Sequence, residues 1–129
     1  MEHITIPAQI DKLDVLQDFI SALMPDEKVL NNVLIAAEEI FVNIAHYAYT
    51  PDTGDVFVDA DINQNHIILE FRDSGKPYDP VNRIDPDTSL SAEEREIGGL
   101  GIFMVKKLMD EVRYEYRDGE NCLTICKNM

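Results

Sequence analysis

The longest helical pattern in the chain, residues 30–49, limits most strongly what the chain can fold into. The segment LNNVLIAAEEIFVNIAHYAY contains no Gly or Pro, and its apolar residues recur three or four positions apart. They are Leu30, Val33, Leu34, Ala37, Phe41, Ile44, Ala45 and Ala48. This spacing predicts a long helix with one buried side, so the chain needs a second layer for that side to pack against.

Polar residues lie beside this apolar stripe, on one face of the same predicted helix. Glu39, Asn43 and His46 are spaced by four and three residues, which places them within about 60° of one another around the helix axis. A carboxylate one turn before a carboxamide, at the edge of a buried face, is a candidate site. The alternative interpretation is a solvated Glu–Asn pair of the kind that many surface helices carry.

The composition is that of an ordinary folded protein with a strong bias in charge. A length of 129 residues predicts a single domain over residues 1–129 with a substantial core, and the 45% of hydrophobic residues is typical of a folded protein. The formal net charge is −14, and non-specific binding to nucleic acid or to an anionic membrane needs positive charge. The bias therefore argues against both partners. A bound phosphate would need backbone N–H groups, a metal ion or a few well-placed cations.

Targeting signals and cysteine usage predict a cytoplasmic protein. No apolar run approaches the roughly 18 residues of a membrane span. The N-terminal MEHITIPAQI has neither the basic nor the apolar region of a signal peptide. Cys122 and Cys126 fall in a predicted strand, about 13 Å apart, which is too far for a disulfide. We therefore expect both thiols to be reduced.

Alternating apolar residues predict two hairpins. In the first, one face carries Val56, Val58, Ala60, Ile62, Ile67, Leu69 and Phe71. By the same alternation Asp73 falls on the side that meets the helices, where an aspartate must be paired or must bind something. The second hairpin joins strands around residues 112–116 and 123–125 through a turn at residues 117–121.

The remaining segments predict a short strand, two further helices and a long loop. Residues 2–6 form the strand and residues 10–24 an amphipathic helix, and Asp26 is the expected N-cap of the long helix. Residues 78–97 contain two prolines and little periodicity, which predicts a long loop of the kind that is often functional. A Gly-rich connection then leads into an apolar helix at residues 102–109.

The order of these elements predicts the fold class. Along the chain they run strand, two helices, hairpin, loop, helix and hairpin, with no internal repeat. We expect a two-layer α/β (α+β) sandwich, in which a mostly antiparallel mixed sheet carries about three helices on one face.

Short polar and glycine patterns could carry chemistry. They are Glu39-x-x-x-Asn43 on the long helix, Asp73-x-Gly75 at a strand end and Gly99-x-Gly101 at a helix start. A Gly-rich loop that opens a helix offers free N–H groups to a phosphate, and an Asn oxygen is a suitable ligand for a divalent metal. A Glu one turn earlier could orient or deprotonate an attacking group, and a buried Asp could accept a hydrogen bond from an exocyclic amine such as that of adenine. Singly, each pattern is also common without function.

Taken together and in this order, the motifs resemble those of the GHKL ATPase superfamily, which has the Bergerat ATP-binding fold. The forms EEIFVNIAHYAY, DSGKPYDP and GGLGIFMVKKLMD are most similar to the anti-sigma-factor serine/threonine kinases. The resemblance extends from about residue 26 to the end of the chain. It implies ATP and Mg²⁺ as cofactors, phosphorylation of a serine on a STAS-type antagonist protein, and regulation of a sigma factor by partner switching. It also implies a homodimer.

The resemblance further implies a role for each motif residue. Asn43 would ligate Mg²⁺, and Glu39 would be the catalytic base. Asp73 would bind the adenine amino group, with Gly75 letting the backbone approach the base. The phosphate-binding turn would be formed by Gly99, Leu100 and Gly101. Residues 79–98 would form a lid over ATP, with Arg83 or Arg95 as phosphate contacts.

Several neighbouring residues depart from these roles. Many members of the superfamily carry a His four residues after the Asn, whereas here that position is Tyr47 and His46 lies one residue earlier. We therefore expect His46 to be solvated or capping rather than a ligand. Glu38 lacks the i, i+4 register to Asn43 and is expected in solvent. Lys106 and Lys107 are expected to complement the C-terminal end of a helix and to be solvated, respectively.

Two other functions remain open beside the kinase. A nucleotide-sensing regulatory module would bind ATP or ADP and change its partner affinity without phosphotransfer, although it would not need a base at Glu39. A detached histidine-kinase catalytic domain is disfavoured, because the chain has no room for a phosphoacceptor helical hairpin and DSGKP differs from the usual DxGxG. Phe57 and Ile68 point away from the predicted helices, which hints at self-association, but scattered surface apolars are an equally simple interpretation.

Overall fold

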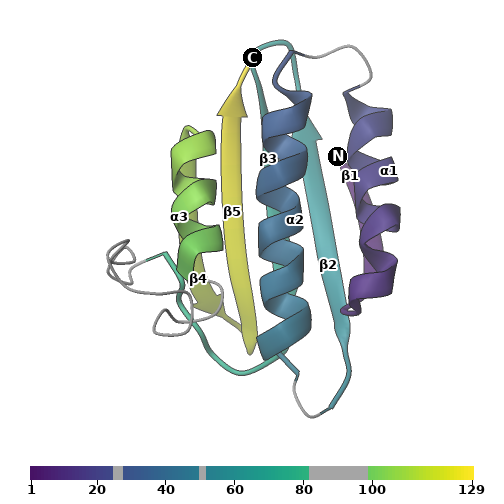
Figure 1. Ribbon diagram of the computed structural model, residues 1–129, viewed down its shortest axis with the longest axis vertical. Helices are drawn as coiled ribbons and strands as arrows, with labels where there is room; N and C mark the ends of the chain where they lie inside the picture. The colour runs from purple at the N-terminus through teal and green to yellow at the C-terminus, as the bar shows by residue number, and fades with distance from the viewer. Residues whose placement is uncertain (25–27, 50–51, 82–98) are drawn as a thin grey trace.

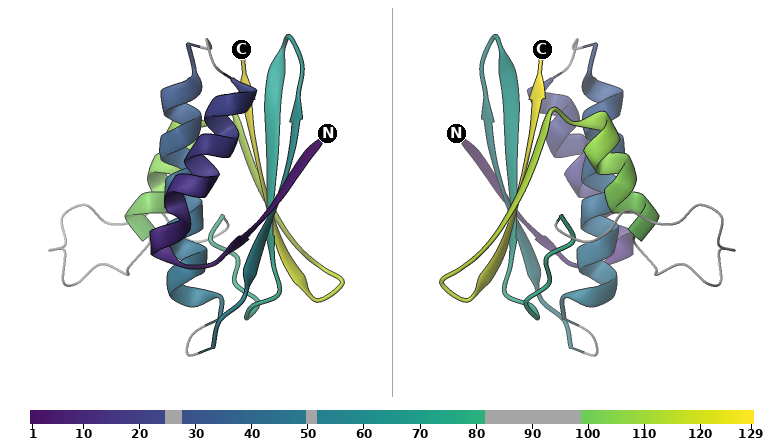
Figure 2. Two further views of the ribbon diagram at one scale, coloured as in Figure 1. Left: turned by 90° about the vertical axis from the view of Figure 1, so that its right-hand side faces the viewer. Right: turned by 90° about the vertical axis from the view of Figure 1, so that its left-hand side faces the viewer.

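The computed structural model describes residues 1–24, 28–49, 52–81 and 99–129, which form two layers (Figures 1 and 2). Within the described residues, one layer is a sheet of five strands and the other consists of three α-helices on one face of that sheet. The predicted sandwich is therefore confirmed. One detail of the prediction is wrong, because every pairing between the described strands is antiparallel and the sheet is not mixed.

The sheet has the order β1-β2-β3-β5-β4. Its strands are β1 (Glu2–Pro7), β2 (Asp55–Ile62), β3 (His66–Asp73), β4 (Glu111–Arg117) and β5 (Glu120–Asn128). Both predicted hairpins are present, as β2–β3 and β4–β5. They join along β3 and β5, where Asp73 is the register partner of Asn121. The last residue of the central strand therefore has a neighbour from the far end of the chain.

The helical layer consists of α1 (Leu13–Leu23), α2 (Leu30–Tyr47) and α3 (Gly99–Leu108), with a short 3₁₀ turn, Ile10–Lys12, before α1. In Figure 1, α2 runs across the middle of the sheet between α1 and α3. The long helix predicted to end at residue 49 ends at Tyr47. The predicted N-cap Asp26 lies outside the described residues.

The buried side of α2 is wider than the predicted stripe. Its buried residues are Val33, Ala36, Ala37, Ile40, Phe41 and Ile44. The stripe omitted Ala36 and Ile40, and it included Leu30, Leu34 and Ala45, which are only half-buried. The difference arises because α2 packs against α1 and α3 as well as the sheet, so neighbouring helices bury positions that a single flat layer would leave in solvent.

The alternation in β2 and β3 matches the prediction, and the side chains of Phe57 and Ile68 lie on the face away from the helices. The second hairpin turns more tightly than predicted. Its turn consists of Asp118 and Gly119, both with positive φ, in place of the expected residues 117–121. Two-residue turns of this kind match the twist of the strands they connect. As a result β5 starts at Glu120, and its next residue belongs to the sheet.

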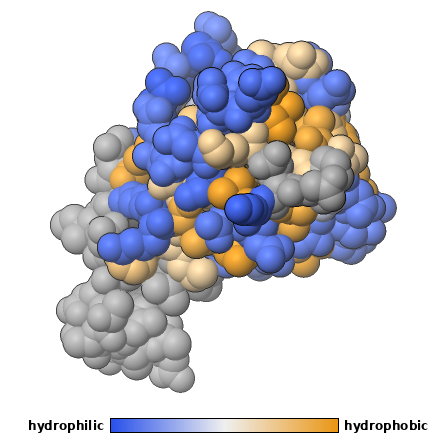
Figure 3. All heavy atoms as spheres, turned by 90° about the horizontal axis from the view of Figure 1, so that it is seen from above, coloured by the Kyte–Doolittle hydropathy of each residue, from blue (hydrophilic) through white to orange (hydrophobic). Residues whose placement is uncertain are grey.

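Cys122 and Cys126 are free, as predicted. None of the helices in the described part of the chain has the length and hydropathy needed to cross a membrane. Hydrophilic and hydrophobic residues are interspersed on the end of the molecule shown in Figure 3.

Candidate functional site

A pocket of about 280 Å³ lies where α2 ends, between the sheet and the segment that follows β3. Its walls include Asn43 and Tyr47 from α2, Asp73 from β3, and Tyr114 and Asn121 from the second hairpin. These elements meet at the lower end of the view in Figure 1. A mostly apolar hollow with a few convergent polar groups is the usual form of a small-molecule site. The structure thus brings together two of the predicted site residues, Asn43 and Asp73.

Asp73 is the buried acidic group of this pocket, with 4% of its surface exposed. Its Oδ1 atom accepts hydrogen bonds from the backbone N–H of Gly75 at 3.0 Å and from Nδ2 of Asn121 at 2.9 Å. Burial raises the pKa of the Asp73 carboxyl, although the bonds from Asn121 and Gly75 act in the opposite direction. The prediction that this aspartate faces the helices is confirmed, and its Oδ2 atom is left for a ligand.

Asn43 holds an unsatisfied acceptor. Its Oδ1 atom is buried and has no hydrogen-bond partner among the described residues. A buried carbonyl oxygen without a partner costs about 1–3 kcal/mol, so such an atom in a pocket wall calls for a ligand. An amide oxygen suits a hard cation such as Mg²⁺. Within the described residues there is no group of three or more His, Cys, Asp or Glu that could hold a metal ion.

Glu39 lies one turn before Asn43 and contacts α3. A Cβ atom placed on Gly101 would lie 2.4 Å from Oε2 of Glu39, so the carboxylate packs directly against this glycine. Burial, and secondarily the neighbouring charge of Glu38, raises the pKa of Glu39. A carboxylate with a raised pKa takes up a proton more readily, which suits a general base. Glu39 does not line the pocket itself but lies beside it.

The glycines predicted to precede a helix lie within it. Residues 99–101 form the first described turn of α3, which runs over Gly99–Leu108 and not from residue 102 as the sequence predicted. The first turn of a helix has N–H groups without intrahelical partners, which favour anions. The absence of a side chain at Gly101 makes room for Glu39. The predicted lid, with Arg83 and Arg95, falls mostly outside the described residues.

Gly75 has a packing role that the sequence did not predict. A Cβ atom at this position would lie 2.2 Å from the carbonyl oxygen of Ala48, at the C-terminal end of α2. The next residue, Lys76, donates its backbone N–H to the same oxygen at 3.0 Å. The residue before Gly75 is held as well, because the hydroxyl of Tyr49 accepts the N–H of Ser74 at 2.8 Å. The turn after Asp73 is therefore fixed against α2.

Asn121 is the site residue that sequence reasoning missed. It is 6% exposed, and its Nδ2 group donates to Oδ1 of Asp73 and, at 2.8 Å, to the carbonyl oxygen of Lys76. Its Oδ1 atom accepts the backbone N–H of Tyr78 at 3.0 Å and the hydroxyl of Tyr114. One amide thus ties the end of β3, the segment after it and β4 together.

A signal for Asn121 exists in the sequence. Asn121, Leu123 and Ile125 alternate along one strand, so Asn121 shares the buried face with two apolar residues. The same argument identified Asp73. The predicted turn at residues 117–121 places Asn121 outside the strand, so the alternation of that strand does not include it.

The aromatic neighbours of the pocket clarify the roles of Tyr47 and His46. The rings of Tyr47 and Tyr78 stack, with centroids 6.2 Å apart and planes at 19°. His46 is exposed and does not line the pocket, as predicted. Its ring makes a tilted contact with Tyr47. On α3, Lys106 and Lys107 lie in the last turn, and the ammonium group of Lys107 lies over the ring of Phe103.

Comparison with known proteins gives one family and several named relatives. A profile of the family described as "Histidine kinase-like ATPase domain" matches residues 6–127. Serine/threonine-protein kinase BtrW of Bordetella bronchiseptica is 28% identical over 92 residues, which cover 70% of this chain and 65% of that protein. Serine-protein kinase RsbW of Listeria monocytogenes is 30% identical over 97 residues, covering 71% of this chain and 62% of that protein. The chain therefore spans less than two thirds of the length of either relative.

Proposed function

The chain belongs to the family of histidine kinase-like ATPase domains, and from this premise we propose that it is a serine/threonine protein kinase that uses ATP and Mg²⁺. The observation that carries the proposal is one pocket with two unused acceptors, Oδ1 of Asn43 and Oδ2 of Asp73. The named kinases among its relatives support the reaction.

The nucleotide base occupies the pocket at Asp73. The free Oδ2 atom accepts a hydrogen bond from the exocyclic amino group of adenine, while the turn at Gly75 holds the carboxylate in place. The apolar walls and the nearby tyrosine rings suit a flat heterocycle. The phosphates then extend towards the first turn of α3, where helical N–H groups favour negative charge.

Two residues of α2 carry out metal binding and proton transfer. Oδ1 of Asn43 is the protein ligand that would hold Mg²⁺, together with phosphate oxygens and water. When bound, the ion neutralises charge that develops on the phosphates during transfer. Glu39 orients the attacking hydroxyl and accepts its proton, a role that its raised pKa favours.

The partners follow from the resemblance described above. The phosphorylated protein is an anti-sigma-factor antagonist of the STAS type, and a sigma factor is held and released by partner switching. The kinase acts as a homodimer in the cytoplasm, where its two free thiols stay reduced.

One observation favours a second function, a nucleotide-sensing module without phosphotransfer. Glu39 lies outside the lining of the pocket, and its carboxylate packs against Gly101. A sensor needs only the pocket residues Asn43 and Asp73, and would change its affinity for a partner when the nucleotide changes.

Phosphotransfer separates the two functions. The protein is incubated with γ-labelled ATP, Mg²⁺ and purified STAS-domain proteins, in parallel with the Glu39→Gln variant. For a kinase we expect label on a serine of one partner, a loss of at least about 100-fold in Glu39→Gln, and unchanged ADP affinity in that variant. Glu38→Gln is the matched control, since Glu38 lacks the i, i+4 register to Asn43. ADP binding without transfer to any partner would instead support the sensor.

A further inference from the structure

One oxygen of the Asp73 carboxylate cannot accept a further hydrogen bond. A carboxylate oxygen offers two lone-pair positions. At Oδ1 of Asp73 both are taken, one by the backbone N–H of Gly75 at 3.0 Å and one by Nδ2 of Asn121 at 2.9 Å. A ligand in the pocket therefore meets a single free acceptor oxygen, Oδ2.

The orientation of the Asn121 amide is fixed by its other partners. Nδ2 also donates to the carbonyl oxygen of Lys76, and Oδ1 accepts from the backbone N–H of Tyr78 and from the hydroxyl of Tyr114. Turning the amide by 180° would place its oxygen against the Asp73 carboxylate and its NH₂ group against an N–H donor. Only 6% of the surface of Asn121 is exposed, so water compensates little for the hydrogen bonds that such a turn would lose. It therefore keeps its donor on Asp73.

Purine bases differ in the donors that they present to such a group. Adenine has one exocyclic amino group, which a single oxygen can accept. Guanine has two donors side by side, N1–H and the 2-amino group, and a carboxylate binds that pair with both oxygens at once. Hypoxanthine has N1–H without the 2-amino group, so it differs from guanine by the second donor alone.

We propose that Asn121 is a positioning residue that sets base specificity, because its amide occupies Oδ1 of Asp73 and leaves one acceptor oxygen for the base. The site then accepts adenine and gains nothing from the second donor of guanine. This inference rests on the proposed nucleotide-binding function and extends it to a residue outside the recognised motifs.

The first experiment uses the unmodified protein and titrates ADP, GDP and IDP by calorimetry. We expect ADP to bind, since its one exocyclic amino group matches the one free oxygen, Oδ2 of Asp73. GDP and IDP should bind equally, within about twofold, because the 2-amino group finds no free oxygen. GDP binding about tenfold more tightly than IDP would overturn the inference, whatever the behaviour of any variant.

The second experiment compares Asn121→Ala with Tyr114→Phe. Asn121→Ala frees a lone pair on Oδ1 and opens the space beside it, so the GDP-to-IDP affinity ratio should rise to about tenfold. Tyr114→Phe removes a different hydrogen bond of the same amide, keeps the donor on Asp73, and should leave the ratio unchanged. Thermal unfolding of both variants shows that each still folds.

The outcomes distinguish this inference from the function on which it rests. If the unmodified protein binds no ADP, the nucleotide-binding function fails and the inference fails with it. If ADP binds normally but a folded Asn121→Ala weakens ADP, GDP and IDP by the same factor, Asn121 has a structural role only, and the inference alone is overturned.

Discussion

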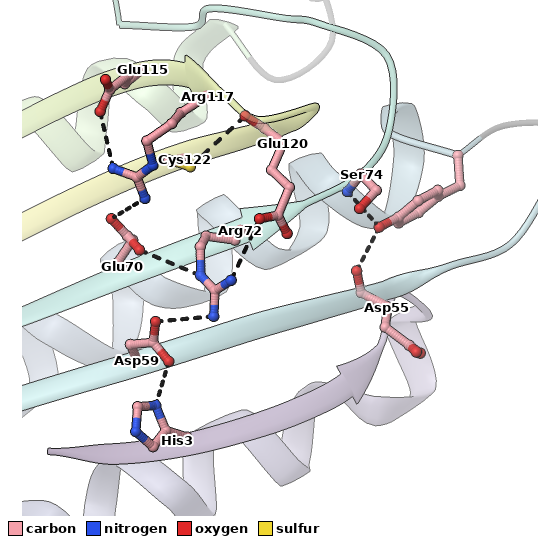
Figure 4. Close-up of polar contacts among 11 residues, drawn as sticks. His3, Asp55, Asp59, Glu70, Arg72, Ser74, Glu115, Arg117, Glu120 and Cys122 are labelled. Atoms are coloured by element: carbon pink, nitrogen blue, oxygen red, sulfur yellow. Dashed lines mark hydrogen bonds and ion pairs between the residues drawn. The ribbon is translucent and has the colours of Figure 1, made fainter.

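The two faces of the sheet hold polar groups in opposite ways. On the outer face, a row of hydrogen bonds and ion pairs crosses the strands, from His3 through Asp59, Arg72 and Glu70 to Arg117 (Figure 4). The nitrogens of Arg72 and Arg117 lie 3.1–3.5 Å from the carboxylate oxygens of this row, and all of these side chains are partly exposed. Exposed pairs of this kind contribute about 0–1 kcal/mol each.

On the inner face, polar groups are few and deeply buried. Asp73 and Asn121 are the buried polar residues of the described core, and both lie at the pocket. With Asn43, they leave two acceptors unused, Oδ1 of Asn43 and Oδ2 of Asp73. The comparison shows that the number of charges does not locate a site. Two buried side-chain atoms of the described residues lack a hydrogen bond, one on each face: Nε of Arg72 still lies 3.4 Å from the Glu70 carboxylate, whereas Oδ1 of Asn43 has no partner and calls for a ligand.

The largest effect is expected from Gly75→Ala, which tests whether the inner face depends on close packing. The new Cβ would lie 2.2 Å from the backbone oxygen of Ala48 and would disrupt the Lys76–Ala48 hydrogen bond. We expect a loss of about 3 kcal/mol in the free energy of unfolding, measured by urea denaturation. Gly101→Ala is the control, since its clash involves the mobile carboxylate end of Glu39. Equal stability of the Gly75 variant would show that the turn does not need this contact.

Asp73→Asn should separate binding from stability on the inner face. The amide loses the free acceptor, so ADP affinity should fall about 10- to 100-fold, measured by calorimetry. Because burial raises the pKa of Asp73, the ionised carboxylate destabilises the fold at neutral pH, and the variant should melt at a higher temperature.

The pH dependence of this difference has a definite sign. A carboxyl with a raised folded-state pKa becomes protonated as pH falls through that pKa, and the unmodified protein then regains stability relative to Asp73→Asn. The gap in melting temperature should be widest at neutral pH and should close as pH falls towards 3.8, the ordinary value. A gap that widens in acid would contradict the burial of this charge.

Asn43→Leu tests the second unused acceptor. Leucine matches the shape of asparagine and removes a buried oxygen without a partner, so stability should be unchanged or higher. ADP affinity is measured once with Mg²⁺ and once with EDTA. The ratio of the two affinities should be about tenfold smaller in Asn43→Leu than in the unmodified protein. Asn31→Leu, on the exposed side of α2, is the matched control. Retained Mg²⁺ dependence in Asn43→Leu would remove Asn43 from the metal site.

The smallest effect is expected on the outer face, from Arg72→Met. Arg72 pairs with Asp59, Glu70 and Glu120 and lies over the ring of Phe57. Because these pairs are partly exposed, we expect the free energy of unfolding to fall by about 1 kcal/mol at most. The loss should be smaller in high salt, and ADP affinity should be unchanged. Urea denaturation at two salt concentrations measures the loss. Weakened ADP binding in Arg72→Met would show that the outer face also contributes to the nucleotide site.

Much of the fold and part of the site follow from local patterns. Alternation placed Asp73 on the inner face, and helical spacing placed Glu39 and Asn43 on one side of α2. These predictions succeed because each depends on the geometry of one element. The start of α3 and the hairpin turn at Asp118 were placed wrongly, since glycine favours a helix end and a turn alike.

Sequence alone determined which candidate site residues share a face, because spacing within a helix or strand fixes where each side chain lies. Only the tertiary structure decided how they are used. Asn121 meets Asp73 because β5 pairs with β3, and Gly75 meets Ala48 because the turn packs on the end of α2. Which lone pairs are occupied, and which remain for a ligand, depends on contacts between segments about 50 residues apart, and no local pattern encodes those contacts.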